Sequence, residues 1–461
     1  MKRYWVNEIK DKVGETVELF GWVNVRRDHG KIIFIDLRDR SGIAQLVFTP
    51  QNEELYKIAE TLRPEWVLFI KGEVSERPQG MENPEIETGK VEVKAVEVVI
   101  LSQSETPPFP LDSAGHEIDE ELRLKYRYLD LRRERLKNNL IMRHKVIKFM
   151  RDYLNDRSFI EIETPILTKS TPEGARDYVV PSRLYPGKFY ALPQSPQQYK
   201  QILMVAGIER YFQIARCFRD EDTRGDRQPE FTQLDLEMSF VEREAILALI
   251  EDLYTELTEK IVNCKILKKP FPRFTYEEAI KRFGDDKFDF RESKNPNTMA
   301  FAWVLDFPLF QKTTTQEISP SHHPFTAPQE RDIRLLDSDP MKVKSWQYDL
   351  VLNGFEIGGG SIRITNPELQ MKVFNILGYS DEEIKEKFSH LLEAYAYGGP
   401  PHGGIALGID RLLSIFANEP NIREVIAFPK TGDARDPMME SPSEIDKKQL
   451  KELHLKVEKD K

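Results

Sequence analysis

Hydrophobic and polar residues alternate along two segments between residues 211 and 240, and a charged loop joins the two segments. In the first, Phe212, Ile214 and Phe218 fall on one side, and in the second Leu234 and Leu236 do the same. Alternation with a period of two is typical of β-strands that have one apolar and one polar face. We therefore predict an antiparallel hairpin that packs on a core and offers a polar floor to a ligand.

Five more strand-like segments occupy the first hundred residues, with one helical stretch after the third. The strands are expected over residues 17–25, 32–37, 43–48, 67–74 and 91–101, and the helix over residues 53–62. Five strands with a helix after the third fit an OB-fold barrel. The connection between the first two strands carries Arg27, His29 and Lys31 ahead of Phe34. Cations beside an aromatic ring suit unpaired bases, although an ordinary barrel rim has the same composition.

The rest of the chain mixes helical and strand patterns, so we predict an α+β protein of two domains. Apolar residues recur with helical spacing over residues 135–158, 243–262 and 381–396. A proline-rich stretch and a charged, helix-like stretch form an expected hinge over 106–133, between a barrel at 1–105 and a larger domain at 134–461. The charged stretch would either touch a nucleic-acid backbone or be a solvated helix.

Composition narrows the class of protein. Of 461 residues, 40% are hydrophobic and 31% charged, and no apolar run approaches the roughly 20 residues that span a bilayer. The N-terminus leads into a strand pattern rather than a signal peptide, so we expect a cytoplasmic protein with no membrane partner. A net charge of −10 confines any RNA contact to local basic patches. Two cysteines, Cys217 and Cys264, are too few for a disulfide framework or a zinc site.

Three strings resemble, in order, the motifs of class II aminoacyl-tRNA synthetases. They are Ile-Glu-Thr-Pro at 162–165, Phe-Arg-Asp-Glu at 218–221 and Gly-Ile-Ala-Leu-Gly-Ile-Asp-Arg at 404–411. Further strings at 172–177, 194–197 and 322–326 resemble the bacterial-type aspartyl enzymes, and this resemblance covers nearly the whole chain. It implies an anticodon-binding OB-fold, a catalytic antiparallel sheet flanked by helices, and a homodimer formed through the first motif and its helix. A helix buried within one chain would show the same apolar pattern.

The resemblance implies that L-aspartate is activated with ATP and transferred to tRNA. Attack of a carboxylate on the α-phosphate needs charge neutralisation and positioning rather than a protein nucleophile. Arg219 and Arg411 are the expected catalytic pair, one at each end of the triphosphate, and Asp349 and Glu356 resemble the family's Mg²⁺ ligands. The implied ATP contacts are Arg219, Asp220, Glu221, Gln228, Glu356, Gly408, Ile409, Asp410 and Arg411.

The side-chain pocket indicates which amino acid is activated. The implied L-aspartate contacts are Glu173, Gln197, Lys200, Arg219, Asp235, His322 and Arg363. Lys200 and Arg363 would hold the β-carboxylate, and Glu173 the α-ammonium. Two buried cations left unpaired by an amide should reject asparagine by roughly 10⁴-fold. An asparaginyl enzyme is therefore disfavoured. A non-catalytic RNA-binding relative would have lost Arg219, Glu356 or Arg411, and all three are present.

The chain departs from most bacterial relatives between the second and third motifs, where they carry a large extra domain. Only about residues 283–300 stand in that place, and their polar sequence, with Asp285 and Asp286, predicts a loop. The missing domain is expected to be peripheral to the catalytic strings on either side of it. Three consecutive glycines at 358–360, by contrast, would let a ligand approach the backbone closely.

On the barrel the resemblance implies anticodon contacts from six residues: Arg27, His29, Phe34, Gln45, Gly80 and Glu92. Strict aspartyl enzymes usually carry leucine at the place of His29, and those that also charge tRNA(Asn) carry histidine; Gly80 resembles a second such marker. A neutral imidazole can accept from the amino group of cytosine or donate to the carbonyl of uracil, the two bases that distinguish these anticodons. We hypothesise that both tRNAs are charged, giving Asp-tRNA(Asn) for a separate amidotransferase. A strict enzyme with a solvated His29 is the alternative.

Overall fold

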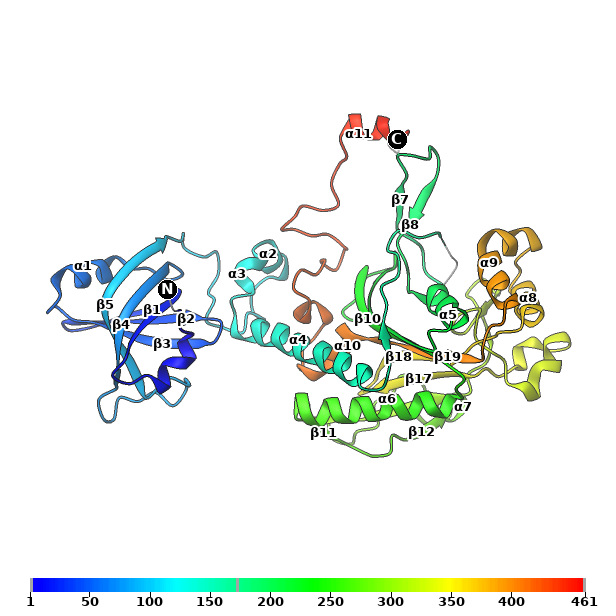
Figure 1. Ribbon diagram of the computed structural model, residues 1–461, viewed down its shortest axis with the longest axis horizontal. Coiled ribbons are helices and arrows are strands. Elements are labelled where there is room, and N and C mark those ends of the chain that lie inside the picture. Colours follow the sequence, from blue (N-terminus) through cyan, green and yellow to red (C-terminus); the bar gives the residue numbers. More distant parts are fainter. Residues whose placement is uncertain (1–2, 171–173, 459–461) are drawn as a thin grey trace. The chain divides into compact units, whose positions relative to one another are not determined.

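The computed structural model describes residues 3–170 and 174–458 (Figure 1). The chain divides into two compact units, Met1–Gly115 and His116–Lys461, which are described separately. No helix of the described ranges is both long and apolar enough to cross a membrane.

The first unit is a closed barrel in the strand order β1-β2-β3-β5-β4, which confirms the predicted OB-fold. Its elements are η1 (Val6–Asp11), β1 (Thr16–His29), β2 (Ile32–Asp39), β3 (Gly42–Phe48), α1 (Glu53–Thr61), β4 (Val67–Glu76) and β5 (Val91–Ser102). Alternate residues such as Ile33 and Ile35 fill the core, where each is at most 1% exposed. Period-two alternation therefore located all five strands.

Strand β1 is longer than its apolar pattern predicts. Val23 is its last buried residue, yet pairing with β2 continues through Arg27↔Phe34 to His29↔Ile32. The turn is only Gly30 and Lys31, with Gly30 at a φ of +62°, a value that suits glycine. Arg27 and His29, which were predicted in the loop, thus lie on paired strand, because backbone pairing extends past the point where side chains leave the core.

The second unit is built on an eight-stranded sheet in the order β12-β14-β17-β18-β19-β10-β9-β6. These strands are β6 (Ile160–Glu161), β9 (Arg210–Phe218), β10 (Glu230–Ser239), β12 (Arg273–Thr275), β14 (Phe301–Leu305), β17 (Gln347–Leu352), β18 (Phe355–Ile362) and β19 (His402–Gly408). Short pairs lie outside the sheet: β7 (Val179–Pro181) with β8 (Phe189–Ala191), β11 (Lys265–Ile266) with β13 (Thr298–Met299), and β15 (Phe310–Lys312) with β16 (Ile318–Pro320). Within the large sheet, β6–β9 and β12–β14 are the parallel pairs among the strands that the structure describes.

Helices α4, α6 and α10 share one large apolar core with the sheet (Figure 1). The helices are α2 (Glu120–Lys125), α3 (Arg127–Asp130), α4 (Glu134–Asn155), α5 (Gln197–Val205), α6 (Arg243–Leu257), α7 (Tyr276–Phe283), α8 (Pro367–Ile376), α9 (Asp381–Ala396), α10 (Ile409–Phe416) and α11 (Lys447–Glu452). Shorter turns are η2 (Thr258–Val262), η3 (Glu330–Asp337), η4 (Pro340–Lys342) and η5 (Ile422–Val425). The three helices expected from periodicity are α4, α6 with η2, and α9.

The hairpin β9–β10 forms as predicted, with one difference. Phe212, Leu234 and Leu236 are fully buried in the core. The opposite side of β10 is buried as well, since Asp235 and Glu237 have no exposed surface. The predicted polar floor is therefore open only in part. Gln233, on the same side of β10, lines a cleft, whereas cations from other elements cover Asp235 and Glu237.

The charged stretch before α4 is not a solvated helix. Asp130 is fully buried and accepts hydrogen bonds from Arg127 Nη1 at 2.8 Å and Arg133 Nε at 2.7 Å. Arg123, 5% exposed, donates to Glu424 Oε1 at 2.9 Å. These guanidinium groups are neutralised inside the unit, so they are not free to bind a nucleic-acid backbone.

Asp130→Ala tests this buried charge network. The substitution leaves the arginines around Asp130 without their shared carboxylate, and breaking a buried pair typically costs about 3–5 kcal/mol. Asp152→Ala is the matched control, because Asp152 is 57% exposed and pairs only with Lys148 on the surface of α4; its loss should be under about 1 kcal/mol. Urea denaturation of both variants measures the difference, and equal losses would contradict the network.

Candidate active site

A cleft of about 490 Å³ opens in the second unit over strands β10, β18 and β19. Seven of the nine predicted ATP residues line it: Arg219, Glu221, Gln228, Glu356, Gly408, Asp410 and Arg411. They come from the β9–β10 loop, from β18, and from the junction of β19 with α10. Residues that are far apart in sequence thus meet around one cavity.

The two remaining predicted residues lie differently. Ile409 is 1% exposed and packs in the core, so its side chain does not face the cleft. Asp220 is tied by backbone pairing to Arg176, its N–H lying 3.0 Å from that carbonyl oxygen. Asp410 does line the cleft, but its carboxylate accepts from the Thr232 N–H at 2.8 Å and from Arg143. That carboxylate anchors α10 to β10 and α4.

Neighbouring residues hold several hydrogen-bond donors of the cleft in place, but some of their N–H groups have no hydrogen-bond partner among the described residues. Arg411 Nη2 lies 3.1 Å from Asp226 Oδ2, while its buried Nε has no hydrogen-bond partner among the described residues. The guanidinium of Arg219 stacks over Phe231 at 5.0 Å from the ring centroid. Gln228 accepts from the Lys430 N–H at 2.7 Å, leaving its amide nitrogen without a partner in the described chain. Buried donors of this kind normally find partners, so an anionic ligand with acceptor groups would satisfy them.

The carboxylates of Asp349 and Glu356 converge over Gly359. A Cβ at Gly359 would lie 2.9 Å from Asp349 Oδ1, 3.1 Å from His322 Cε1 and 3.6 Å from Glu356 Oε1, so only glycine leaves this space open. Burial raises the pKa of Asp349 well above its usual value, and Glu356 raises it further. Two crowded carboxylates suit a hard divalent cation.

The described residues contain no cluster of three or more metal-ligating side chains. A magnesium ion held by Asp349 and Glu356 would therefore complete its coordination with water and phosphate oxygens, which is how Mg²⁺ usually binds beside nucleotides. The donor set fits that use and does not fit a closed structural site.

Next to the cleft, two cations and two carboxylates form a buried quartet. Lys200 Nζ bonds Asp235 Oδ1 and lies 3.2 Å from Glu237 Oε2, and Arg363 Nε donates to Glu237 Oε1 at 2.8 Å. All four side chains are at most 1% exposed. The predicted pocket cations are thus already paired, which corrects the expectation that an amide ligand would leave them without a partner.

Glu237 is a site residue that the sequence reasoning missed. Burial alone would raise the pKa of Glu237, but Arg363 and Lys200 outweigh it and hold the pKa at about 2. A signal was present, because Glu237 follows Asp235 by two residues on the same side of β10. Its neighbour across the sheet is Gly404, where a Cβ would lie 2.1 Å from Glu237 Oε2.

The two histidines of the 322–326 string lie against each other, with ring centroids 4.4 Å apart and ring planes tilted by 40°. Burial, with Arg363 adding to it, lowers the pKa of His322 to about 3, and burial lowers the pKa of His323 too. His323, which was not predicted, bonds Arg363 Nη1 through Nε2. Both rings are therefore neutral at physiological pH.

Gln197 and Glu173 are the remaining predicted residues of the amino-acid pocket. Gln197 is 6% exposed, and its amide nitrogen has no partner among the described residues, as is also true of Asp235 Oδ2. An unused donor and an unused acceptor in a buried pocket are what an amino acid could satisfy. Glu173 lies outside the residues that the structure describes.

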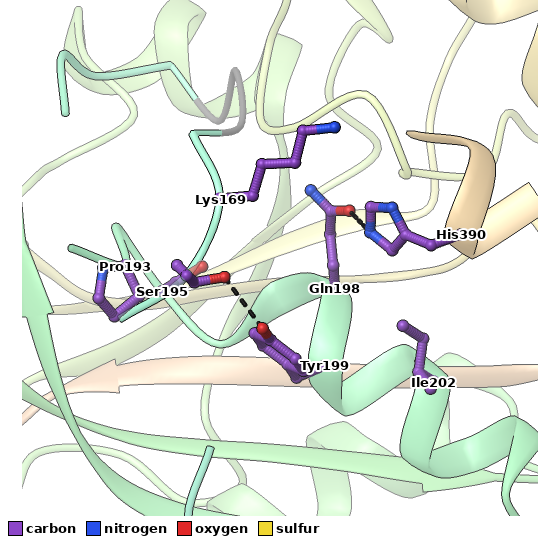
Figure 2. Close-up of a pocket in the computed structure, with 8 residues that line it drawn as sticks. Lys169, Pro193, Ser195, Gln198, Tyr199, Ile202 and His390 are labelled. Atoms are coloured by element: carbon purple, nitrogen blue, oxygen red, sulfur yellow. Dashed lines mark hydrogen bonds between the residues drawn. The ribbon is translucent and has the colours of Figure 1, made fainter. Parts of the chain in front are cut away.

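Helix α5 presents different side chains to different sides. Lys200 enters the quartet, whereas Gln198, Tyr199 and Ile202 line a separate cavity of about 210 Å³ (Figure 2). There His390 Nε2 lies 2.6 Å from Gln198 Oε1. This packing holds the helix that positions Lys200.

On the outer face of the barrel, four side chains form a hydrogen-bonded row. Arg27 Nη2 donates to Asp36 Oδ1 at 2.7 Å and to Gln45 Oε1 at 3.3 Å, and Gln45 Nε2 donates to Glu92 Oε2 at 3.0 Å. Three of these were predicted as anticodon residues. Asp36 was missed, although it shares the outward side of β2 with Phe34. Burial raises the pKa of Asp36 despite the opposing charge of Arg27.

His29 and Phe34 lie at one end of this row. Their rings are 5.9 Å apart and edge-on, His29 is exposed, and Phe34 points away from the core that Ile33 and Ile35 fill. Gly80 lies in a turn beyond β4, with a φ of +83° and its N–H bonded to Glu82. The structure thus brings five of the six predicted residues onto one face.

Comparisons with known proteins agree with this geometry. Residues 17–101 match an OB-fold nucleic acid binding domain and residues 119–432 match the tRNA synthetases class II (D, K and N). A Rubrobacter xylanophilus protein named aspartate–tRNA(Asp/Asn) ligase is 46% identical over 96% of this chain and 95% of its own length. A Syntrophomonas wolfei protein of the same name is 44% identical over 96% and 97%. The first alignment runs over 570 positions, so that relative carries residues that this chain lacks.

Solved structures share the fold. Asparaginyl-tRNA synthetase from Pyrococcus horikoshii, complexed with asparaginyl-adenylate, superposes with a TM-score of 0.76 at 22% identity over 94% of this chain and 98% of that one. A putative aspartyl-tRNA synthetase from Leishmania major gives 0.75 at 20% identity over 93% and 94%. The match of residues 119–432, together with relatives of up to 46% identity along nearly the whole length, shows that the chain belongs to the class II tRNA synthetases of the D, K and N group.

Proposed function

We propose that this protein is an aspartate–tRNA(Asp/Asn) ligase that forms aspartyl-adenylate from L-aspartate and ATP and transfers the aspartyl group to the 3′ end of tRNA(Asp) and tRNA(Asn). The observation that carries the proposal is the buried quartet of Lys200, Arg363, Asp235 and Glu237 beside a cleft that holds Arg219 and Arg411. The names of the relatives agree with it. We expect the enzyme to work in the cytoplasm and to pass Asp-tRNA(Asn) to an amidotransferase.

In the first step the α-carboxylate of aspartate attacks the α-phosphorus of ATP and pyrophosphate leaves. Arg219 neutralises the approaching carboxylate and the α-phosphate, and Arg411, released from Asp226, binds the far end of the triphosphate. Gln228 and Glu221 contact the adenine. In the second step a hydroxyl of the terminal tRNA ribose attacks the adenylate carbonyl, and AMP leaves.

Asp349 and Glu356 would hold Mg²⁺, which when bound neutralises phosphate oxygens and fixes their positions. Gly359 leaves room for it, because any side chain there would meet Asp349 Oδ1 at 2.9 Å. His322, neutral and beside the same space, offers a ring nitrogen between the phosphate site and the amino-acid pocket.

Selectivity for aspartate is attributed to the cations that would face its side chain. Glu173, which lies outside the described residues, would contact the α-ammonium. Lys200 and Arg363 would share their hydrogen-bond donors between Asp235, Glu237 and the β-carboxylate of aspartate. The neutral amide of asparagine would accept only a weaker hydrogen bond from them.

A homodimer completes the proposal. Helix α4 packs its residues Val146, Met150 and Leu154 on its own sheet, so its apolar stripe needs no partner. Apolar side chains nevertheless remain exposed around the first motif, with Ile160 at 50% and Leu167 at 52%. Such a patch favours association with a second copy.

Arg219→Ala is expected to reduce aspartate-dependent ATP–pyrophosphate exchange by roughly 10²–10³-fold or more, the loss typical of one oriented donor to a developing anion. The protein should stay folded, since Arg219 is half-buried at the cleft and makes no ion pair that the structure records. Arg216→Ala is the control, an exposed arginine on β9, the strand that leads into the loop of Arg219, where it pairs with Glu230. Exchange within tenfold of the parent would refute the assignment.

Lys200→Met is expected to raise the KM for aspartate more than the KM for ATP, because Lys200 belongs to the amino-acid pocket. Since Lys200 also neutralises two buried carboxylates, the variant will lose stability. The KM values for aspartate and for ATP are therefore measured at a temperature well below the unfolding midpoint of the variant. An unchanged aspartate KM would remove Lys200 from the substrate site.

His29→Leu is expected to lower charging of tRNA(Asn) relative to tRNA(Asp) by roughly 5–150-fold, the value of about 1–3 kcal/mol for one base contact. Phe34→Ala serves as the comparison, because the loss of base stacking should weaken the binding of both tRNAs equally, by about 1–3 kcal/mol. Adenylate formation without tRNA should change in neither variant. If the parent enzyme prefers tRNA(Asp) by more than about 10³-fold, beyond one base contact, the enzyme is strict.

A further inference from the structure

The short segment between α7 and β13, residues 284–297, reaches the nucleotide cleft. It is irregular, as the sequence predicts. Lys287 Nζ lies 3.0 Å from Glu356 Oε2, and both Lys287 and Asp285 line the cleft. The segment that stands where relatives carry a larger insertion therefore supplies a cation to the candidate metal ligand.

Aromatic packing holds Lys287 at this position. Its neighbour Phe288 is 5% exposed, stacks on Phe283 with ring centroids 4.0 Å apart, and meets Phe274 edge-on at 5.3 Å. Asp289 lies against the β17–β18 turn, 3.5 Å from where a Cβ of Gly354 would stand. The backbone on the C-terminal side of Lys287 is thus anchored to the sheet, while its side chain stays 43% exposed.

The contact of Lys287 with Glu356 competes with metal binding at that carboxylate. Glu356 Oε1 faces the space over Gly359, and Lys287 contacts the other oxygen, Oε2. A divalent ion on Oε1 would repel the nearby ammonium and weaken its contact with Glu356. The carboxylates of Asp286 and Asp349 lie near Lys287 as well. With a nucleotide bound, the phosphates held by Arg411 and Arg219 would be further strong acceptors within reach of its flexible four-carbon side chain.

We infer that Lys287 is a phosphate-binding residue of the nucleotide site, which neutralises Glu356 while the cleft is empty and moves onto the triphosphate once a divalent ion takes that carboxylate. The inference rests on the proposed binding of ATP in this cleft. According to this inference, the short segment helps to position ATP, and no longer insertion is needed for that task.

The inference predicts two effects of opposite sign in Lys287→Met. ATP binding, measured by calorimetry without aspartate, should weaken by roughly tenfold or more, because a charge-assisted contact is lost. Binding of Mn²⁺ without nucleotide, followed by electron paramagnetic resonance, should tighten severalfold, because Glu356 no longer has an internal cation. Lys287→Arg should restore ATP binding, and Lys281→Met, at an exposed site on α7, should change neither measurement.

The outcomes separate the two proposals. If the parent protein does not bind ATP, the proposed function fails and this inference fails with it. If the parent binds ATP but Lys287→Met binds it equally well, the inference alone is overturned. Weakening of ATP and Mn²⁺ together, or an equal effect in Lys281→Met, would also overturn it, because Lys287 would then only support the local structure.

Discussion

The buried carboxylate of Glu237 is the interaction on which the amino-acid pocket depends. It contacts both Lys200 and Arg363, the two cations expected to recognise the substrate side chain, and it has no exposed surface. Without it, two positive charges would lie in a low-dielectric interior with only Asp235 to balance them, a costly arrangement. Glu237 thus permits a cationic pocket to exist before the substrate arrives.

The same principle extends through the whole site. In the described chain Lys287 rests on Glu356, Arg411 on Asp226, and the pocket cations on their carboxylates. Ligand binding is then an exchange of partners rather than the filling of a bare charged cavity. Because each side chain is already oriented, less conformational freedom is lost on binding, and neutral rings such as His322 separate the groups without adding charge.

Features that depend on residues close together in the sequence were predictable, whereas contacts between residues far apart in the sequence were not. Periodicity predicts the barrel strands and the helices α6 and α9, because their buried residues recur at a regular spacing along the sequence. Strand β1 was cut short because Arg26–His29 pair through the backbone and carry no apolar signal. The contact of Lys287 with Glu356 joins a polar loop to a strand about 70 residues away, and no local pattern encodes such a pairing. Motif resemblance located Arg219 and Arg411, but it did not indicate that Arg219 stacks on Phe231 or that Arg411 pairs with Asp226.

The extended pairing of β1 has a consequence for how tRNA specificity can change over time. His29 stands opposite Ile32 on a two-stranded ribbon whose backbone bonds do not depend on the side chain displayed. One codon change at this exposed position can therefore replace the group that we propose meets the third anticodon base, with little effect on folding. A lineage that gains or loses an independent asparaginyl enzyme can adjust this ligase to match by point mutation, without rebuilding a loop.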